Sequence, residues 1–233
     1  MNQIIPAGAY SVSEATTYIY GTFPKRMREC SKLHLNTRHL HWWIKQGLSG
    51  GYLGGYDAKH SFINFYDLIT MRVIATLRAH GIKHREIVQT DKILKKQFGW
   101  QYPFAMAEFW SAVPNIFIKI GDTPVAASRY LQSAMDFFTE YMKPTHGLTF
   151  DLGGLAGKWE PKQDILLDPQ IQFGEPCISG TRIPTQVLWS FHEAGDSVDS
   201  LAYMYVISSK RIKEAIDWED QIQKATKQRP IST

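Results

Sequence analysis

Cysteine is scarce in this chain of 233 residues, and long apolar runs are missing. The two cysteines, Cys30 and Cys177, lie far apart and form no C-x-x-C pattern, which argues for a reducing compartment and against a disulfide scaffold or a zinc knuckle. No apolar run approaches the roughly 20 residues needed to cross a bilayer. The first residues, MNQIIPAGAY, lack the charged start and apolar stretch of a signal peptide. We therefore expect a cytoplasmic protein with no membrane partner.

Motifs of the common enzyme classes are also missing. The sequence contains no G-x-G-x-x-G, Walker, H-E-x-x-H or G-x-S-x-G motif. His39 and His41 would point to different sides of a helix, so a shared metal ion is not expected. We predict a protein without enzymatic activity, cofactor or metal site. The alternative from another class is a nucleic-acid-processing enzyme with an unfamiliar site in the middle of the chain.

Acidic residues are few in the first part of the chain. Residues 1–99 contain 14 lysines and arginines against 6 aspartates and glutamates, a net charge of +8. Residues 100–233 contain 12 against 16, a net charge of −4, which gives the overall +4. A basic part joined to an acidic part indicates two different partners, although ordinary surface variation can produce the same asymmetry.

The segment LNTRHLHWWIKQG, residues 35–47, places two adjacent tryptophans among basic side chains. Read as a helix capped by Asn36, it separates into two faces with spacings of three and four residues. The apolar face consists of Leu40, Trp43, Ile44 and the terminal Gly47. The basic face consists of Arg38, His41, Trp42 and Lys45. Since no acidic residue occurs from position 30 to 56, the basic face favours a phosphate-lined partner over a merely solvated surface.

The periodicity predicts an α+β, mainly α fold in three parts. Residues 1–100 are expected to form a winged helix-turn-helix domain, residues 101–161 a small α+β segment, and residues 162–233 a three-helix domain preceded by short strands. The expected helices cover 12–20 with a Ser11 and Glu14 capping box, 36–47, 64–80, 83–98, 185–194, 197–205 and 209–224. A hairpin is expected before residue 64, strands within 115–128 and 147–163, a linker at the end of that last stretch, and a frayed C-terminus. Residues 129–142 fit either a helix or a strand.

In a winged helix-turn-helix the second helix enters the major groove of DNA. Arg38 could pair bidentately with guanine, and Asn36 and Thr37 at the helix start could contact a phosphate. Lys45, His41 and the ring edge of Trp42 would then hold the backbone. Each residue also has a structural alternative, because Asn36 may only cap the helix, His39 may only be exposed, and Trp42 may pack under the wing.

The first 90 residues resemble the MerR-type winged helix-turn-helix. The likeness rests on YSVSEA, NTRHLHWWIKQGL and SFINFYDLITMRVIATLRAHGIKHREI, although the connection at 21–34 is about a dozen residues longer than usual. The resemblance implies binding of operator double-stranded DNA by a dimer. By that match, Asn36, Arg38, His41 and Trp42 take the positions that touch DNA. The full set of expected DNA-binding residues is Asn36, Thr37, Arg38, His39, His41, Trp42, Lys45, Tyr56, Lys59 and His60.

The segment DPQIQFGEPCISGTRIPTQVLWSFHEAGDSVDSLAYMYVISSKRIKEAIDWE resembles a small domain of unknown function found in VapB-type antitoxins. The resemblance implies a type II antitoxin that binds and neutralises a PIN-like ribonuclease toxin and represses its own operon, as a homodimer or a hetero-oligomer with the toxin. We expect toxin contacts from Arg182, Trp189, His192, Tyr203, Tyr205 and Trp218. The alternative is a MerR-like regulator with a ligand-sensing C-terminal region and no toxin.

Charge gives independent support to a partner at the C-terminal part. Residues 162–220 contain 5 lysines and arginines against 10 aspartates and glutamates, which suits the basic rim of an RNA-cleaving site. Arg182 could pin the turn after Gly180 by bonding backbone carbonyls, or reach an acidic metal site of the partner. The three helices could also form a second helix-turn-helix. However, the acidic residues that follow Lys213 would disfavour binding of its last helix in a DNA groove.

Overall fold

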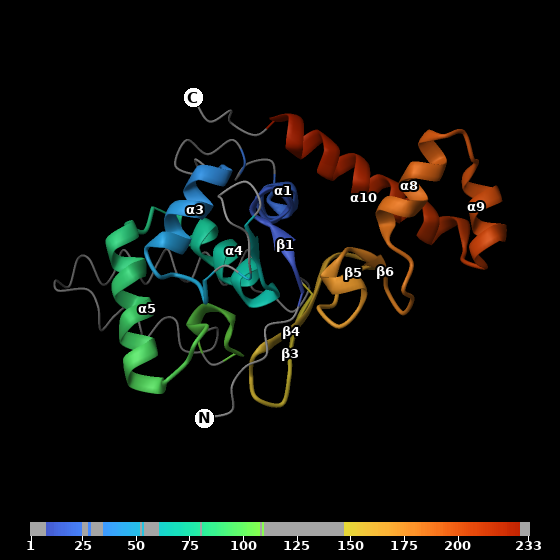
Figure 1. The fold of residues 1–233 in the computed structure, drawn as a ribbon. Coiled ribbons are helices and arrows are strands. Elements are labelled where there is room, and N and C mark those ends of the chain that lie inside the picture. Colours follow the sequence, from blue (N-terminus) through green and yellow to red (C-terminus); the bar gives the residue numbers. More distant parts are fainter. Residues whose placement is uncertain are drawn as a thin grey trace.

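The computed structural model confirms an α+β, mainly α fold (Figure 1). It describes residues 8–24, 28, 35–51, 53, 61–79, 81–107, 109 and 147–228. The helices are α1 (Val12–Thr22), α3 (Thr37–Lys45), α4 (Phe65–Ala79), α5 (His84–Phe98), α8 (Thr185–Glu193), α9 (Val198–Tyr205) and α10 (Ser209–Gln228), with short 3₁₀ turns at η1 (Pro103–Ala105) and η3 (Gln172–Gly174). The strands are β1 (Tyr10–Ser11), β2 (Phe62–Ile63), β3 (Leu148–Phe150), β4 (Ala156–Lys162), β5 (Ile165–Leu167) and β6 (Cys177–Ile178). The expectations for 115–128 and 129–142 lie outside the described residues.

Two predicted caps fix the starts of α1 and α3. The Ser11 hydroxyl accepts a bond from the Glu14 amide at 3.1 Å, and the Glu14 carboxylate accepts from the Ser11 amide at 2.8 Å. At α3, the Asn36 side-chain oxygen accepts from the His39 amide at 3.0 Å. Both caps could be predicted from the sequence because each joins residues that are only three positions apart.

The stretch before α4 is extended, as predicted, but it also pairs with the N-terminal strand. β2 runs antiparallel to β1, with Tyr10 opposite Ile63 and Ser11 opposite Phe62. On the other side of β2, the Leu53 amide donates to the Phe62 carbonyl at 2.8 Å, which is the contact expected at the base of a hairpin. The tip of the predicted hairpin lies outside the described residues.

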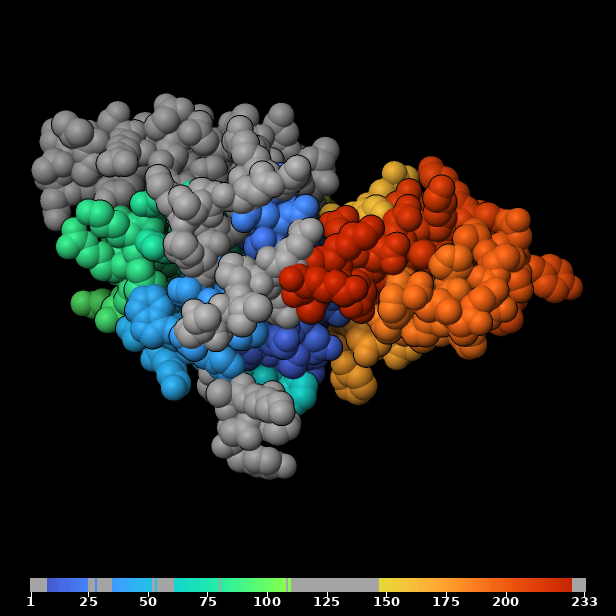
Figure 2. Space-filling view, turned by 90° about the horizontal axis from the view of Figure 1, so that it is seen from above, coloured from blue at the N-terminus to red at the C-terminus, as the bar shows by residue number. Residues whose placement is uncertain are grey.

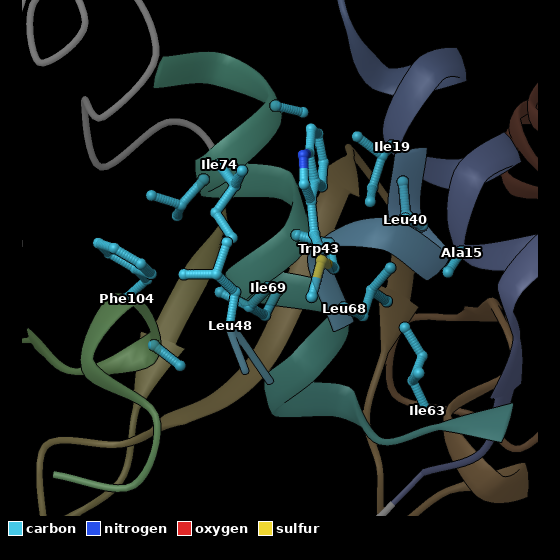
Figure 3. Packing of buried hydrophobic residues seen from close by; sticks show 14 of the residues in the cluster. Ala15, Ile19, Leu40, Trp43, Leu48, Ile63, Leu68, Ile69, Ile74 and Phe104 are labelled. Carbon is cyan, nitrogen blue, oxygen red and sulfur yellow. The ribbon is translucent and has the colours of Figure 1, made fainter. Parts of the chain in front are cut away.

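The larger hydrophobic core lies where α1, α3 and α4 meet, and β4 closes it (Figure 3). Leu40 and Trp43 of α3 point into this core beside Ile19 of α1. From the sheet side, Trp159 is 1% exposed, and the guanidinium of the buried Arg72 lies 5.1 Å from the centre of its ring. Burial lowers the pKa of Arg72 to about 10, so the group stays charged at neutral pH and makes a cation–π contact.

The predicted linker near residue 161 is wrong, because the chain makes a hairpin there. β3, β4, β5 and β6 form one antiparallel sheet in that order, and Lys162 pairs with Ile165 across a tight turn. Leu167 belongs to the first core, whereas Ile165 on the same strand belongs to a second core under α8, α9 and α10. The sheet therefore spans the expected boundary at 161/162, and the division into three domains stays a prediction.

The three C-terminal helices form as predicted, except that α10 continues to Gln228 where a frayed end was expected. The extension is held because α10 packs along α1, where a Cβ at Gly21 would come within 2.8 Å of Ile222. The Gln221 amide donates to the Gly21 carbonyl at 2.7 Å. We call the region of the second core, under α8, α9 and the first part of α10, the C-terminal lobe. Figure 2 shows that α10 joins this lobe to the rest of the protein. Among the described residues, no helix has both the length and the apolarity to span a membrane.

Asp67 ties the base of the hairpin to α4 from a fully buried position. Its carboxylate accepts from the Gly50 amide at 2.8 Å and from the Asn64 amide at 3.4 Å. Burial raises the pKa of Asp67 from 3.8 to about 7, although these two amides and the charge of Lys95 pull it down. Protonated Asp67 is therefore the form that folding favours below neutral pH.

The pH dependence of stability should carry the signature of Asp67. Because its pKa is higher in the folded than in the unfolded state, its contribution is complete below about pH 4 and is lost as the pH rises towards 7. In Asp67→Asn, we expect the fall in unfolding free energy between pH 4.5 and 8 to shrink by roughly 3 kcal/mol. Urea unfolding of both proteins across this pH range measures the change. If the unfolding free energy of the two proteins depended on pH in the same way, the raised pKa of Asp67 would be contradicted.

Candidate nucleic-acid interface

Helix α3 has the two faces that its sequence predicts. Leu40, Trp43 and Ile44 are buried, at 0%, 4% and 6% exposure, whereas Arg38 and Lys45 are exposed. Gly47 was expected on the buried face, but it lies beyond the end of the helix and is exposed. His41 is half-buried. The helix therefore presents a cationic surface while its apolar side anchors it to α1 and α4.

Trp42 lies in this surface with 43% of its area exposed. One side of its indole rests on the imidazole of His84 from α5, with 4.0 Å between the ring centres. Burial, with the charge of Arg78, lowers the pKa of His84, so the imidazole is neutral and stacks as an apolar ring. Trp42 is thus supported by α5, a contact that neither sequence alternative anticipated.

A second contact from α5 is made just beyond the C-terminal end of α3. The Lys95 ammonium donates to the Gly47 carbonyl at 2.9 Å and pairs with Asp91 at 2.8 Å. A cation at this position satisfies a carbonyl at the end of the helix and complements its dipole. His84 and Lys95, about three turns apart on α5, therefore hold the C-terminal half of α3 against this helix. Both residues can be seen in the sequence, but contacts between residues 42 to 48 positions apart have no local signal.

Helix α5, which contacts Trp42 and Gly47, also carries exposed cationic side chains. Both carboxylates of α5 are buried: Glu86 accepts from the Lys83 amide at 2.9 Å, and Asp91 pairs with Lys95. The exposed cations at this helix are Lys83, Arg85, Lys92 and Lys96. With its acids turned inward, the α3–α5 surface suits a polyanion such as a phosphate backbone.

The remaining predicted DNA contacts fall into two groups. Asn36 and His39 are half-buried and contact each other. The Asn36 side-chain oxygen accepts from the His39 amide as the helix cap and lies 2.9 Å from Nδ1 of the His39 ring. Thr37 is half-buried at the first turn. Tyr56, Lys59 and His60 lie outside the described residues. Arg38, Trp42 and Lys45 are thus the members of the predicted set that the structure exposes together on α3.

The residues expected to contact a toxin differ in their exposure. Tyr203 is 90% exposed and Arg182 is exposed, whereas Trp189, His192 and Tyr205 are half-buried. The Trp189 indole donates to Asp220 at 3.0 Å, and Nδ1 of His192 lies 2.8 Å from the Asp196 carbonyl. Trp218 is 1% exposed in the second core, so it stabilises the lobe from inside and offers no contact surface.

The turn after β6 is pinned by an arginine, but the residue is Arg211. Its guanidinium donates to the Ser179 carbonyl and, at 3.1 Å, to the Asp164 carboxylate. No described residue accepts a bond from the side chain of Arg182, which was the residue expected to hold this turn. The prediction failed because Arg211 reaches the turn from α10, 32 residues away in sequence.

The C-terminal lobe exposes large apolar side chains that sequence reasoning missed. They are Val187, Phe191, Met204 and Val206, at 36%, 41%, 55% and 91% exposure. Residues 183–209 contain no lysine or arginine but include Glu193, Asp196 and Asp199. Val206 also adopts a left-handed backbone with φ of 55°, which is unfavourable for a β-branched residue. Apolar groups in an acidic setting are typical of a protein-binding surface for a basic partner.

Comparisons with known proteins agree with this architecture. Residues 165–218 match a family of unknown function, DUF433. The fold is similar to the crystal structure of Rv2018 from Mycobacterium tuberculosis, with a TM-score of 0.67 and 15% identity, covering 93% of this chain and 100% of that chain. At this identity the likeness concerns the fold alone. A comparison with curated proteins gave no match.

The description of the matched family assigns no activity. For chemistry at the site, the structure offers binding groups. Among the described residues, no group of three or more histidine, cysteine, aspartate or glutamate side chains is placed to hold a metal ion. The arrangement on α3 and α5 can bind phosphates by charge and stack an indole against a sugar or base.

Proposed function

We propose that the protein is a cytoplasmic DNA-binding repressor that acts as the antitoxin of a type II toxin–antitoxin system. In this proposal α3 reads operator DNA, and the C-terminal lobe binds and neutralises a PIN-like ribonuclease. The observation that carries the DNA-binding part is the exposure of Arg38, Trp42 and Lys45 on a helix anchored by buried Leu40 and Trp43. A helix held in this way can enter a major groove without losing its core contacts.

The toxin-binding part is supported by the chemistry of the C-terminal lobe. Its exposed Phe191, Tyr203 and Val206 lie in a segment that carries only negative charge. Such a surface repels DNA and attracts a protein whose own ligand is RNA, because ribonucleases present cations around the site that binds the phosphates. Repressors of this architecture usually act as symmetric dimers on paired half-sites, and we propose the same here.

A co-expression experiment tests the two parts separately. The tagged chain is produced with the product of the neighbouring open reading frame, and DNA binding is measured with the duplex upstream of its own gene. We expect a stoichiometric complex with a small PIN-like protein and a salt-dependent shift of the duplex. DNA binding without any such partner would instead favour a MerR-like regulator that responds to a small molecule. Absence of DNA binding would overturn the proposal.

Tyr203→Ala should separate partner binding from stability. Because the side chain is 90% exposed, its removal should change the unfolding free energy by less than about 0.5 kcal/mol. If the lobe docks a partner here, the dissociation constant should rise about tenfold or more, as for an aromatic hot spot. Calorimetry on the purified pair measures this effect. Gln186→Ala, at an exposed polar position on α8, is the matched control, and an equal effect of both substitutions would argue against a specific contact.

A further inference from the structure

A cavity of about 350 Å³ lies between α1, the turn after η3, and the helices α8 and α10. Its volume is at the lower end of small-molecule sites, which span roughly 300–1,000 Å³. It lies at the junction of the two cores, since α1 belongs to the first and α10 packs against both. None of the residues proposed to contact DNA lines it.

The cavity is lined by carboxylates without a counter-charge. Glu14 comes from α1, Glu175 from the turn after η3, and Glu219 from α10. No lysine, arginine or histidine of the described residues is part of the lining. Tyr18 lines the same cavity, and its pKa is raised by burial and then by the charges of Glu14, Glu219 and Glu175. The negative field of the cavity therefore favours a cation.

Glu219 is the strongest indication of a ligand. Its side chain is almost fully buried, at 5% exposure. Oε1 accepts a bond from the Thr185 hydroxyl, but no donor from the described residues reaches Oε2. Burial raises the pKa of Glu219, and the charge of Glu175 adds to the rise. The hydrogen bond from Thr185 acts in the opposite direction but is the weaker effect. Glu219 therefore lines the cavity with one carboxylate oxygen that no described protein donor reaches and that is not fully buried, and this oxygen can accept a charge-assisted hydrogen bond when a cationic donor enters.

The spacing of these groups favours an extended organic cation over a metal ion. Glu14, Glu175 and Glu219 line one cavity, yet the described residues contain no cluster close enough to coordinate a metal ion. Between the carboxylates, Pro176, Pro184 and Ile222 supply apolar wall. Charged ends with an aliphatic centre are the features of a linear diamine or polyamine, whose methylenes would cover the apolar wall while its ammonium groups reach separate carboxylates.

We propose that this cavity binds a small aliphatic di- or polyamine. Bound there, the amine bridges α1 and α10, so it stabilises the junction between the DNA-binding helices and the C-terminal lobe. This site does not depend on the proposed DNA or toxin binding, and it is tested on the protein alone.

Calorimetric titration of the full, nucleic-acid-free chain with 1,4-diaminobutane and with spermidine tests the site. We expect saturable binding to one site, about tenfold weaker for butylamine, which has a single charge, and a rise in melting temperature with ligand concentration. Glu175→Gln should weaken diamine binding about fivefold, as for a partly exposed ion pair. Glu14→Gln should act similarly, because glutamine preserves the capping box of α1.

Glu193→Gln is the matched control, since it removes an exposed carboxylate of α8 that does not line the cavity. It should bind diamine like the wild type, and all three variants should melt near the wild-type temperature without ligand. Absence of saturable binding overturns the proposal. Equal weakening by Glu193→Gln and Glu175→Gln does so too, because it would mean only diffuse attraction to an acidic surface. DNA binding measured on the same preparations reports independently on the proposed function.

Discussion

Arg38→Ala is expected to weaken operator binding about 5- to 150-fold, which corresponds to the roughly 1–3 kcal/mol of a bidentate arginine–guanine contact. Arg38 is exposed near the start of α3, where side chains of a recognition helix meet base edges. The loss should be larger for the operator than for a random duplex, because a base contact carries sequence information and a phosphate contact does not. Fluorescence anisotropy with both duplexes at fixed salt measures the two losses.

Lys224→Ala provides the control for the charge change of Arg38→Ala. Lys224 is exposed on α10 and is not one of the residues of the α3–α5 surface, so its removal should leave operator affinity within about twofold of wild type. The Arg38→Ala variant should unfold at the wild-type temperature. If the proposed function holds, it should also still bind and neutralise the toxin. Loss of DNA binding, partner binding and thermal stability together would show that the fold had failed, and the contact would then remain unproven.

Trp218→Ala is expected to lower the free energy of unfolding by about 3–5 kcal/mol, the usual cost of removing a large buried aromatic side chain. Trp218 is 1% exposed in the core of the C-terminal lobe. Its ring also stacks with that of Tyr18 from α1, with 6.4 Å between centres, so the cavity left behind opens at the junction of the two cores. Denaturant unfolding followed by circular dichroism measures the change.

Trp218→Phe separates packing from a surface role for this residue. Phenylalanine keeps most of the apolar volume, and the indole N–H of Trp218 has no hydrogen-bond partner among the described residues. We therefore expect Trp218→Phe to recover more than half of the stability lost in Trp218→Ala. If both substitutions left stability unchanged and weakened only partner binding, the burial of Trp218 in the functional protein would be refuted.

Features encoded by neighbouring residues could be predicted from the sequence. The capping box of Ser11 and Glu14 and the two faces of α3 depend on spacings of three and four residues. The same holds for α8, α9 and α10, which begin and end near turn-forming residues such as Gly195 and Ser197. For these elements the local pattern and the tertiary packing favour the same structure.

Features that depend on contacts across the chain could not be predicted. The pairing of β4 with β5 replaced a linker because the strands share a sheet with β3 and β6, and a polar stretch such as Glu160–Lys162 has no strong strand signal of its own. Arg211 took the place of Arg182 at the turn after β6 through a contact from α10. The support of Trp42 by His84 likewise depends on how α5 packs against α3.

The acidic cavity shows the same limit for the candidate sites. Glu14 and Glu219 are separated by more than 200 positions, and only the packing of α10 on α1 brings them to one cavity. In the sequence, Glu14 has a complete explanation as a capping residue, and Glu219 is one of several acids in its helix. Charge counts indicated that the C-terminal part is acidic, but they could not indicate where the acids converge.

The central claim is that the cationic face of α3 binds the phosphates and base edges of a duplex. The most direct test is the salt dependence of operator affinity for the wild type and for the double variant Arg38→Ala and Lys45→Ala. Removing two cationic contacts should reduce the slope of log affinity against log salt by about 2 and lower the affinity at every salt concentration. Two coincident lines would contradict the claim, because they would show that this face of α3 makes no contact with DNA.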